Sequence, residues 1–132
     1  MKKIALITGV SGQDGAYLAK HLLEKNYKVV GTDRRSARGN NWRLKRLFIE
    51  DKVIFEEMEI GEIYEIDRIF NKYKFDEVYN LAAQSFVGTS FNSPLNTANI
   101  TGLGALRILE TIKAKNKKIK FYQASSSEMF GD

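Results

Sequence analysis

Lys-Ile-Ala-Leu-Ile-Thr-Gly-Val-Ser-Gly-Gln-Asp-Gly, residues 3–15, is the stretch that decides the fold. Its apolar first half predicts a β-strand, and its three glycines, spaced three residues apart, predict a tight turn into a helix from Ala16 to about Lys25. Glycines in such a turn let a ligand approach the backbone without meeting a Cβ atom. The first amides of the helix have no partner within it and favour an anion such as a pyrophosphate. We therefore expect a dinucleotide to be bound by Gly9, Gly12, Gln13, Asp14 and Gly15.

The residues around this turn strengthen the dinucleotide interpretation. Three glycines alone could do no more than close a strand–helix connection. Here they follow an apolar strand and open an amphipathic helix that carries Tyr17, Leu18, Leu22 and Leu23. Their spacing differs from the Gly-x-Gly-x-x-Gly of the common dehydrogenase fingerprint. We therefore expect a phosphate-binding turn with the spacing Gly-x-x-Gly-x-x-Gly.

The rest of the chain alternates short β-rich runs with helical segments of crossover length. We predict further strands at residues 28–32, 53–55, 76–83 and 119–124, and helices at 42–49, at 63–70 and from Pro94 to about Ile112. This alternation predicts an α/β fold with a doubly wound parallel sheet. A chain of 132 residues with 43% hydrophobic content is one domain long, so we expect residues 1–132 to form a single domain.

Charge and composition exclude several classes of protein. The net charge of +5 comes from cations scattered over the chain, and the densest basic run, Lys113 to Lys120, falls at a predicted helix end, so nucleic-acid binding is not predicted. There are no cysteines, which excludes disulfides and thiolate metal sites, and we predict no metal site. No apolar run reaches the length of a membrane span, and Met1-Lys2-Lys3 leads directly into the first strand. We expect a cytoplasmic protein that does not bind membranes.

The end of the second strand bears on the choice of cofactor. Asp33 follows the glycine turn at the distance at which an acidic residue holds a ribose 2′-hydroxyl, whereas Arg34 and Arg35 would accommodate a 2′-phosphate. Because arginine binds phosphate with a fixed bidentate geometry, the pair favours NADP over NAD. A solvated turn is the alternative. After the third strand, Glu59 is expected near the adenine, with a solvated strand end as its alternative.

The fourth strand is expected to form another wall of the cofactor site. Small residues at the carboxyl end of a strand let a flat ligand lie against the backbone, and open α/β sheets bind their ligands at this end. We expect cofactor contacts from Leu81, Ala82 and Ala83, and a substrate contact from Ser85 in the polar loop beyond them. Trp42, in the second predicted helix, is expected to pack rather than to contact a ligand.

Four segments together resemble the GDP-mannose 4,6-dehydratases, which belong to the extended short-chain dehydrogenases/reductases. They are residues 8–15 (Thr-Gly-Val-Ser-Gly-Gln-Asp-Gly), 33–36 (Asp-Arg-Arg-Ser), 79–88 (Tyr-Asn-Leu-Ala-Ala-Gln-Ser-Phe-Val-Gly) and 121–131 (Phe-Tyr-Gln-Ala-Ser-Ser-Ser-Glu-Met-Phe-Gly). Gln13-Asp14 and the Asn-Leu-Ala-Ala-Gln-Ser segment are more specific than the glycines. The resemblance covers the whole chain but only the amino-terminal part of the family's length. It implies a truncated Rossmann-like NAD(P)-binding domain from which the substrate domain is absent.

The resemblance implies an internal redox reaction on GDP-mannose with NADP. In that reaction hydride leaves C4 of the sugar, a carboxylate removes the C5 proton, water leaves C6, and the hydride returns to C6. By the match of the motif, Ser126, where the family usually carries threonine, would hydrogen-bond the C4 oxygen, and Glu128 would be the base at C5. On the residues alone, Ser125 to Ser127 form a polar turn and Glu128 caps the next helix.

The family's Tyr-x-x-x-Lys pair does not occur in these 132 residues. The chain alone is therefore expected to bind the dinucleotide but not to turn over, and the resemblance implies a homo-oligomer. Two other interpretations stay open: a non-catalytic nucleotide-binding module, and another nucleotide-sugar enzyme of the short-chain class, an epimerase or a reductase. The Ser126-x-Glu128 pair argues against an epimerase, which needs no base at C5.

Overall fold

The computed structural model describes residues 2–33, 42–59, 62–81, 104–115 and 118–123. Within these ranges the chain forms one parallel five-stranded sheet with the order β3-β2-β1-β4-β5. The elements in chain order are β1 (Ile4–Thr8), α1 (Gln13–Glu24), β2 (Lys28–Asp33), α2 (Trp42–Arg46), β3 (Ile54–Glu57), α3 (Ile63–Lys72), β4 (Glu77–Asn80), α6 (Gly104–Lys115) and β5 (Lys120–Gln123). The predicted α/β fold with a doubly wound parallel sheet is confirmed.

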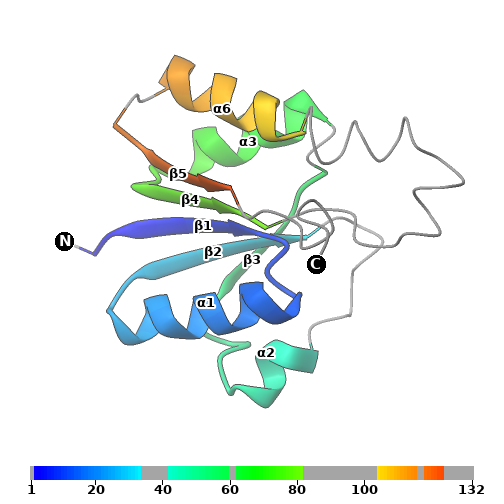
Figure 1. The fold of residues 1–132 in the computed structure, drawn as a ribbon, viewed down its shortest axis with the longest axis vertical. Coiled ribbons are helices and arrows are strands. Elements are labelled where there is room, and N and C mark those ends of the chain that lie inside the picture. The colour runs from blue at the N-terminus through cyan, green and yellow to red at the C-terminus, as the bar shows by residue number, and fades with distance from the viewer. Residues whose placement is uncertain (1, 34–41, 60–61, 82–103, 116–117, 124–132) are drawn as a thin grey trace, which may run out of the picture.

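Helices cover both faces of the sheet: α1 and α2 lie on one face, and α3 and α6 lie on the other (Figure 1). The two layers follow from the direction of the chain, because right-handed crossovers put helices on opposite faces when the direction of winding reverses. The chain winds outward from β1 to β3 and then returns to place β4 on the other side of β1. β1 and β4 therefore flank the topological switch point, outside which such sheets bind ligands.

The hydrophobic core has one part on each face of the sheet. β1 and β2 contribute to both parts, which explains why both strands are buried along almost their whole length. The part under α1 and α2 contains Ala5, Ile7, Val10, Ala16, Ala19, Leu22, Val29, Leu44, Ile49 and Val53. The part under α3 and α6 contains Leu6, Val30, Met58, Ile66, Ile69, Phe70, Phe75, Val78, Ile108 and Ile112. In the described segments no helix is long and apolar enough to cross a membrane.

The two helices on the glycine-turn face end in the same cap. After α1, Asn26 has a φ of 68°, and the amide of Tyr27 bonds the carbonyl of Leu22 at 3.0 Å. After α2, Phe48 has a φ of 59°, and the amide of Ile49 bonds the carbonyl of Leu44 at 3.0 Å. Each is a Schellman motif, whose left-handed position is usually glycine and sometimes asparagine. Because the chain turns at Phe48, α2 ends earlier than the predicted residue 49.

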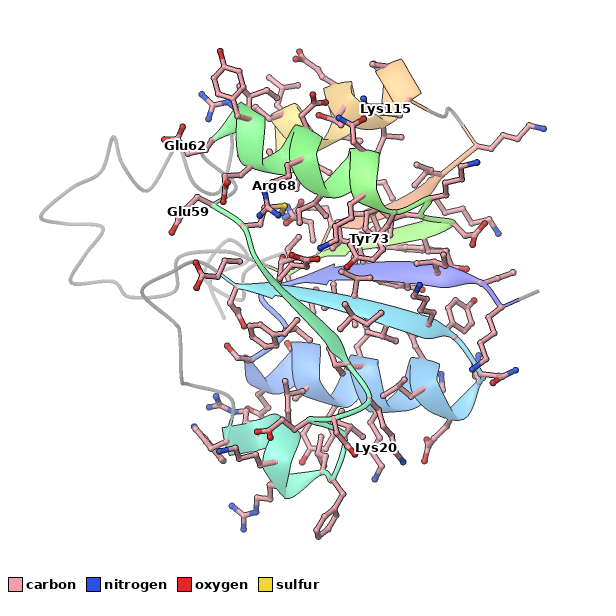
Figure 2. All side chains as sticks on the ribbon, turned by 180° about the vertical axis from the view of Figure 1, so that it is seen from behind. Lys20, Glu59, Glu62, Arg68, Tyr73 and Lys115 are labelled. Atoms are coloured by element: carbon pink, nitrogen blue, oxygen red, sulfur yellow. The ribbon has the colours of Figure 1, made fainter. Side chains whose placement is uncertain are left out.

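The outer strand β3 is tied to α3 by a partly buried carboxylate. Glu56 accepts hydrogen bonds from Lys72 at 2.8 Å and from Tyr73 at 2.6 Å, and Arg68 lies 3.6 Å away. Figure 2 shows Arg68 and Tyr73 on the side of β3 that faces α3. Burial acts to raise the pKa of Glu56, but the bonds from Lys72 and Tyr73 outweigh it and hold this pKa below its ordinary value. The ionised form of Glu56 therefore contributes to the stability of the fold.

The outer strand β5 is less buried than β3. Its four residues are exposed or half-buried, and Tyr122 stacks on Tyr79 of β4 with ring centroids 4.8 Å apart. Tyr79 also donates a hydrogen bond of 2.6 Å to Glu77, whose other oxygen accepts one of 2.8 Å from Tyr27. Burial, followed by the bond to Glu77, raises the pKa of Tyr79. The Tyr79 hydroxyl is therefore neutral at physiological pH and donates its hydrogen bond to Glu77. Tyr122 of β5 thus stacks on a ring that belongs to β4.

Candidate functional site

The glycine turn is fixed to the end of β2 by backbone hydrogen bonds. The amides of Gly9 and Val10 both donate to the carbonyl of Thr32, at 2.8 and 3.2 Å. Gly9 has a φ of 72°, in the left-handed region that favours glycine. These two backbone bonds hold the start of the turn at the carboxyl ends of β1 and β2, beside the switch point.

The three glycines serve different physical purposes. Gly9 supplies the left-handed backbone conformation, and Gly15 supplies close packing, because a Cβ atom there would lie 2.5 Å from the Gly9 carbonyl oxygen and 2.8 Å from Val10 Cα. A Cβ atom on Gly12 would come no closer than 3.4 Å to any neighbour, which is an ordinary contact. Gly12 is exposed and has a φ of −73° that any residue adopts. Neither packing nor backbone conformation requires glycine at position 12.

The start of α1 is exposed beside Gly12. Gly12 is the N-cap of the helix and provides no side-chain cap, and Gln13 and Asp14 in the first turn are exposed. The first amides of an α-helix lack intrahelical partners and carry the positive end of the helix dipole. The arrangement provides donors for an anionic group beside a backbone that has no side chain at Gly12.

Asp33 and Arg43 hold the Ser11 peptide between them. The amide of Ser11 donates to Asp33 Oδ2 at 3.1 Å, and Arg43 Nη1 donates to the Ser11 carbonyl oxygen at 3.2 Å. Asp33 is 8% exposed, so its carboxylate is part of the packed turn. The Arg43 guanidinium lies 4.3 Å from the ring centroid of Trp42. Trp42, expected to pack, is 48% exposed and has this cation as its neighbour.

Sequence reasoning missed Arg43 and the way Asp33 is used. A basic residue in a short helix after a polar loop gives no sign that it returns to the glycine turn, because 32 positions separate it from Ser11. Asp33 had been expected at a ribose hydroxyl. In the structure its carboxylate accepts the Ser11 amide of the turn.

A chain of side-chain hydrogen bonds lines the switch point. The Thr8 hydroxyl donates to Asn80 Oδ1 at 2.5 Å, and Asn80 Nδ2 donates to Gln123 Oε1 at 2.7 Å. The amide of Leu81 donates to Thr8 Oγ1 at 3.0 Å, which brings this predicted cofactor residue beside the glycine turn. The bonds join the carboxyl ends of three neighbouring strands.

Glu59 lies at the same end of the sheet, beyond β3, and its carbonyl oxygen accepts the amide of Glu62 at 2.9 Å (Figure 2). The structure thus brings the predicted glycines, Asp33 and Leu81 together around the end of β1. The remaining predicted site residues lie outside the described residues; they are Arg34, Arg35, Ala82, Ala83, Ser85, Ser126 and Glu128.

Comparison with known proteins relates the chain to one enzyme family. The sequence pattern of the family described as GDP-mannose 4,6 dehydratase matches residues 6–132. The GDP-mannose 4,6-dehydratase of Vibrio cholerae serotype O1 is 48% identical over 98% of this chain and 37% of its own length. GDP-mannose 4,6 dehydratase 1 of Arabidopsis thaliana is 44% identical over 98% of this chain and 39% of its own. The chain therefore spans less than two fifths of the length of these relatives.

Solved structures agree on the fold. The UDP-glucose 4-epimerase of Thermotoga maritima is 30% identical, with a TM-score of 0.78 over 93% of this chain and 38% of its own. An enzyme of Bordetella bronchiseptica in complex with NAD+ is 27% identical, with a TM-score of 0.72 over 88% of this chain and 37% of its own. The epimerase shares the fold at a lower identity than the dehydratases do. The chain belongs to the GDP-mannose 4,6-dehydratase family.

Proposed function

We propose that the chain binds NADP at the glycine turn and forms the dinucleotide-binding part of a GDP-mannose 4,6-dehydratase. The observation that carries the proposal is the bare backbone at Gly12, which internal packing does not require, beside the uncapped start of α1. The pyrophosphate would lie there, with Gly9, Gln13, Asp14 and Gly15 shaping the turn. Leu81, Ala82 and Ala83 would contact the cofactor, and Glu59 would lie near the adenine.

The preference for NADP over NAD rests on the end of β2. The Asp33 carboxylate accepts the amide of Ser11 through Oδ2, which fixes it beside the glycine turn. Arg34 and Arg35 follow it directly and offer bidentate donors suited to a 2′-phosphate. The NAD+ complex of the Bordetella bronchiseptica enzyme supports a nicotinamide dinucleotide without choosing between the two.

In the complete enzyme, bound NADP would accept a hydride from the sugar and return it. We propose that Ser126 holds the C4 oxygen of GDP-mannose by a hydrogen bond, that Glu128 takes the C5 proton, and that Ser85 contacts the substrate. These roles come from the family motif. The 132 residues lack the Tyr-x-x-x-Lys pair, so we expect cofactor binding without turnover. We also propose a cytoplasmic enzyme, because the chain has no cysteine, and a homo-oligomer, because outer strands invite pairing between copies.

Trp42 provides the measurement. It is the single tryptophan, and its neighbour Arg43 bonds the Ser11 carbonyl, so its fluorescence reports on the glycine turn. NADPH should quench it saturably and at a lower concentration than NADH does. The absence of saturable quenching with either dinucleotide would reject the proposal, and tighter binding of NADH would reject the preference for NADP.

Gly12→Asp is the sharpest test of the phosphate position. Aspartate is a good N-cap residue and the backbone at this position suits it, so the free energy of unfolding should not fall. Its side chain would occupy the place of the pyrophosphate and repel it, so NADPH affinity should fall by about tenfold or more. Gly12→Ser is the matched control without the charge and should have a smaller effect. Unchanged NADPH affinity in a folded Gly12→Asp variant would show that the pyrophosphate does not bind at the turn.

A further inference from the structure

The hydrogen-bonded side chains at the switch point cross the sheet rather than follow one strand. Thr8 in β1, Asn80 in β4 and Gln123 in β5 stand side by side in the register of the parallel ladder. Thr8 is 0% exposed and Asn80 is 1% exposed, whereas Gln123 is exposed. A buried amide is costly unless it is hydrogen-bonded, and Asn80 meets this requirement through its neighbours on both sides.

The geometry gives each group in the series a fixed orientation. The Thr8 hydroxyl gives its proton to Asn80 Oδ1 and accepts the amide of Leu81, so its rotation is determined. With its oxygen directed to Thr8, the Asn80 amide presents its Nδ2 to Gln123. A displacement of β1 at Thr8 would therefore change the position of the Asn80 amide and, through it, the hold on Gln123.

Both ends of the series adjoin parts of the proposed site. Thr8 directly precedes Gly9, the first residue of the glycine turn. Gln123 ends β5, and the motif that contains Ser126 and Glu128 follows it in the sequence. β5 is the least buried of the five strands, and at its end the bond between Asn80 and Gln123 adds to the backbone ladder with β4.

We propose that Thr8, Asn80 and Gln123 are positioning residues that couple cofactor binding at the glycine turn to the position of the carboxyl end of β5. This inference rests on the proposed function, since it takes the turn to be the cofactor site. Coupling of this kind is reciprocal: a ligand that orders the turn orders β5, and a loosened β5 weakens the ligand.

The test is hydrogen exchange of the 132-residue chain with and without NADPH. Binding should slow amide exchange at the glycine turn and also in β5. Gln123→Ala removes the last link at an exposed position, so the fold should persist. In this variant the protection of residues 9–15 by NADPH should remain, and the added protection of residues 120–123 should be lost. Asn80→Ala should have the same effect, with NADPH affinity lowered about fivefold.

Thr8 and Thr111 form a matched pair of controls. Each is buried and makes a side-chain hydrogen bond, but the Thr111 hydroxyl bonds the Arg107 carbonyl within α6. Thr8→Val should weaken NADPH binding and uncouple β5, Thr8→Ser should restore both, and Thr111→Val should lower stability alone. Equal losses of affinity in the two valine variants would show a general effect of destabilisation and overturn the proposal.

The outcomes separate this inference from the proposed function. If NADPH protects no part of the chain, cofactor binding itself fails. If NADPH protects the glycine turn but leaves β5 unchanged in the parent chain, cofactor binding stands and the coupling is wrong. If β5 gains the same protection in Gln123→Ala as in the parent chain, the coupling does not pass through Gln123.

Discussion

The glycine turn and the outer strands are held by different kinds of contact. At the turn, backbone atoms touch backbone atoms: Gly9 bonds Thr32, and Gly15 lies against Gly9 and Val10. The outer strands pair with their neighbours in the sheet, and side chains add further connections through Glu56 on β3 and through Tyr122 and Gln123 on β5. Side chains can move aside and backbone cannot. The turn should therefore be far less tolerant of substitution than the outer strands.

Gly15→Ala should have the largest effect. The new Cβ atom would meet the Gly9 carbonyl oxygen at 2.5 Å and Val10 Cα at 2.8 Å, and both are backbone atoms. We expect the free energy of unfolding to fall by about 3 kcal/mol or more, measured by urea denaturation. Gly12→Ala, in the same turn, is the control and should cost less than half as much. Similar losses of unfolding free energy in the two variants would show that the backbone of the turn shifts to accommodate a methyl group at position 15.

Gly31→Ala should cost less, because it meets a side chain. A Cβ atom at Gly31 would lie 2.7 Å from Cγ1 of Val10, a fully buried residue of the glycine turn. We expect a loss of about 2 kcal/mol. Val10→Ala should restore part of it, so that the double variant is more stable than the sum of the two single losses predicts. Strict additivity would show that Val10 is not the obstacle.

Glu56→Gln tests the attachment of β3 and should cost about 1 kcal/mol at neutral pH, because Lys72 loses its charged partner. The pKa of Glu56 is lowered in the folded chain, so its contribution is present above the ordinary carboxyl pKa and is lost as the pH falls through the folded value. The stability difference between parent and variant should therefore shrink in acid. Glu65→Gln, which removes a 3.7 Å contact with Arg68, is the matched control. A difference independent of pH would contradict the assignment.

Tyr122→Ala should have the smallest effect of the four, about 0.5–1 kcal/mol, because the residue is 47% exposed and its ring stacks on Tyr79. Tyr64, which is 84% exposed, provides the control: Tyr64→Ala should change the stability less. The comparison between turn and outer strands would fail if Tyr122→Ala cost as much as Gly31→Ala.

Much of the fold could be predicted because it depends on periodicity. The five strands and the glycine turn are local features, in which apolar runs and glycine spacing reflect burial and backbone conformation directly. The exact ends were less predictable: α2 stops before Phe48, a residue with no intrinsic preference for a left-handed cap.

The site was predictable only where its chemistry is local. Gly9, Gly12 and Gly15 are evenly spaced in the sequence, but only their contacts in the structure show that each glycine has a different physical role. Arg43 and Gln123 meet their partners across 32 and 43 positions, so no short pattern reveals them. The use of Asp33 is of the same kind, because the sequence does not say which amide its carboxylate accepts.

The caps of α1 and α2 have a consequence for the evolution of this chain. Asn26 suits its left-handed position, whereas Phe48 holds the same conformation with 83% of its surface in solvent. Selection for stability alone would replace Phe48 by glycine or asparagine, since little apolar burial would be lost. A library of variants screened for heat resistance should therefore soon be enriched in glycine or asparagine at position 48. If phenylalanine is retained over evolution despite that gain in stability, its retention measures a selective pressure other than folding.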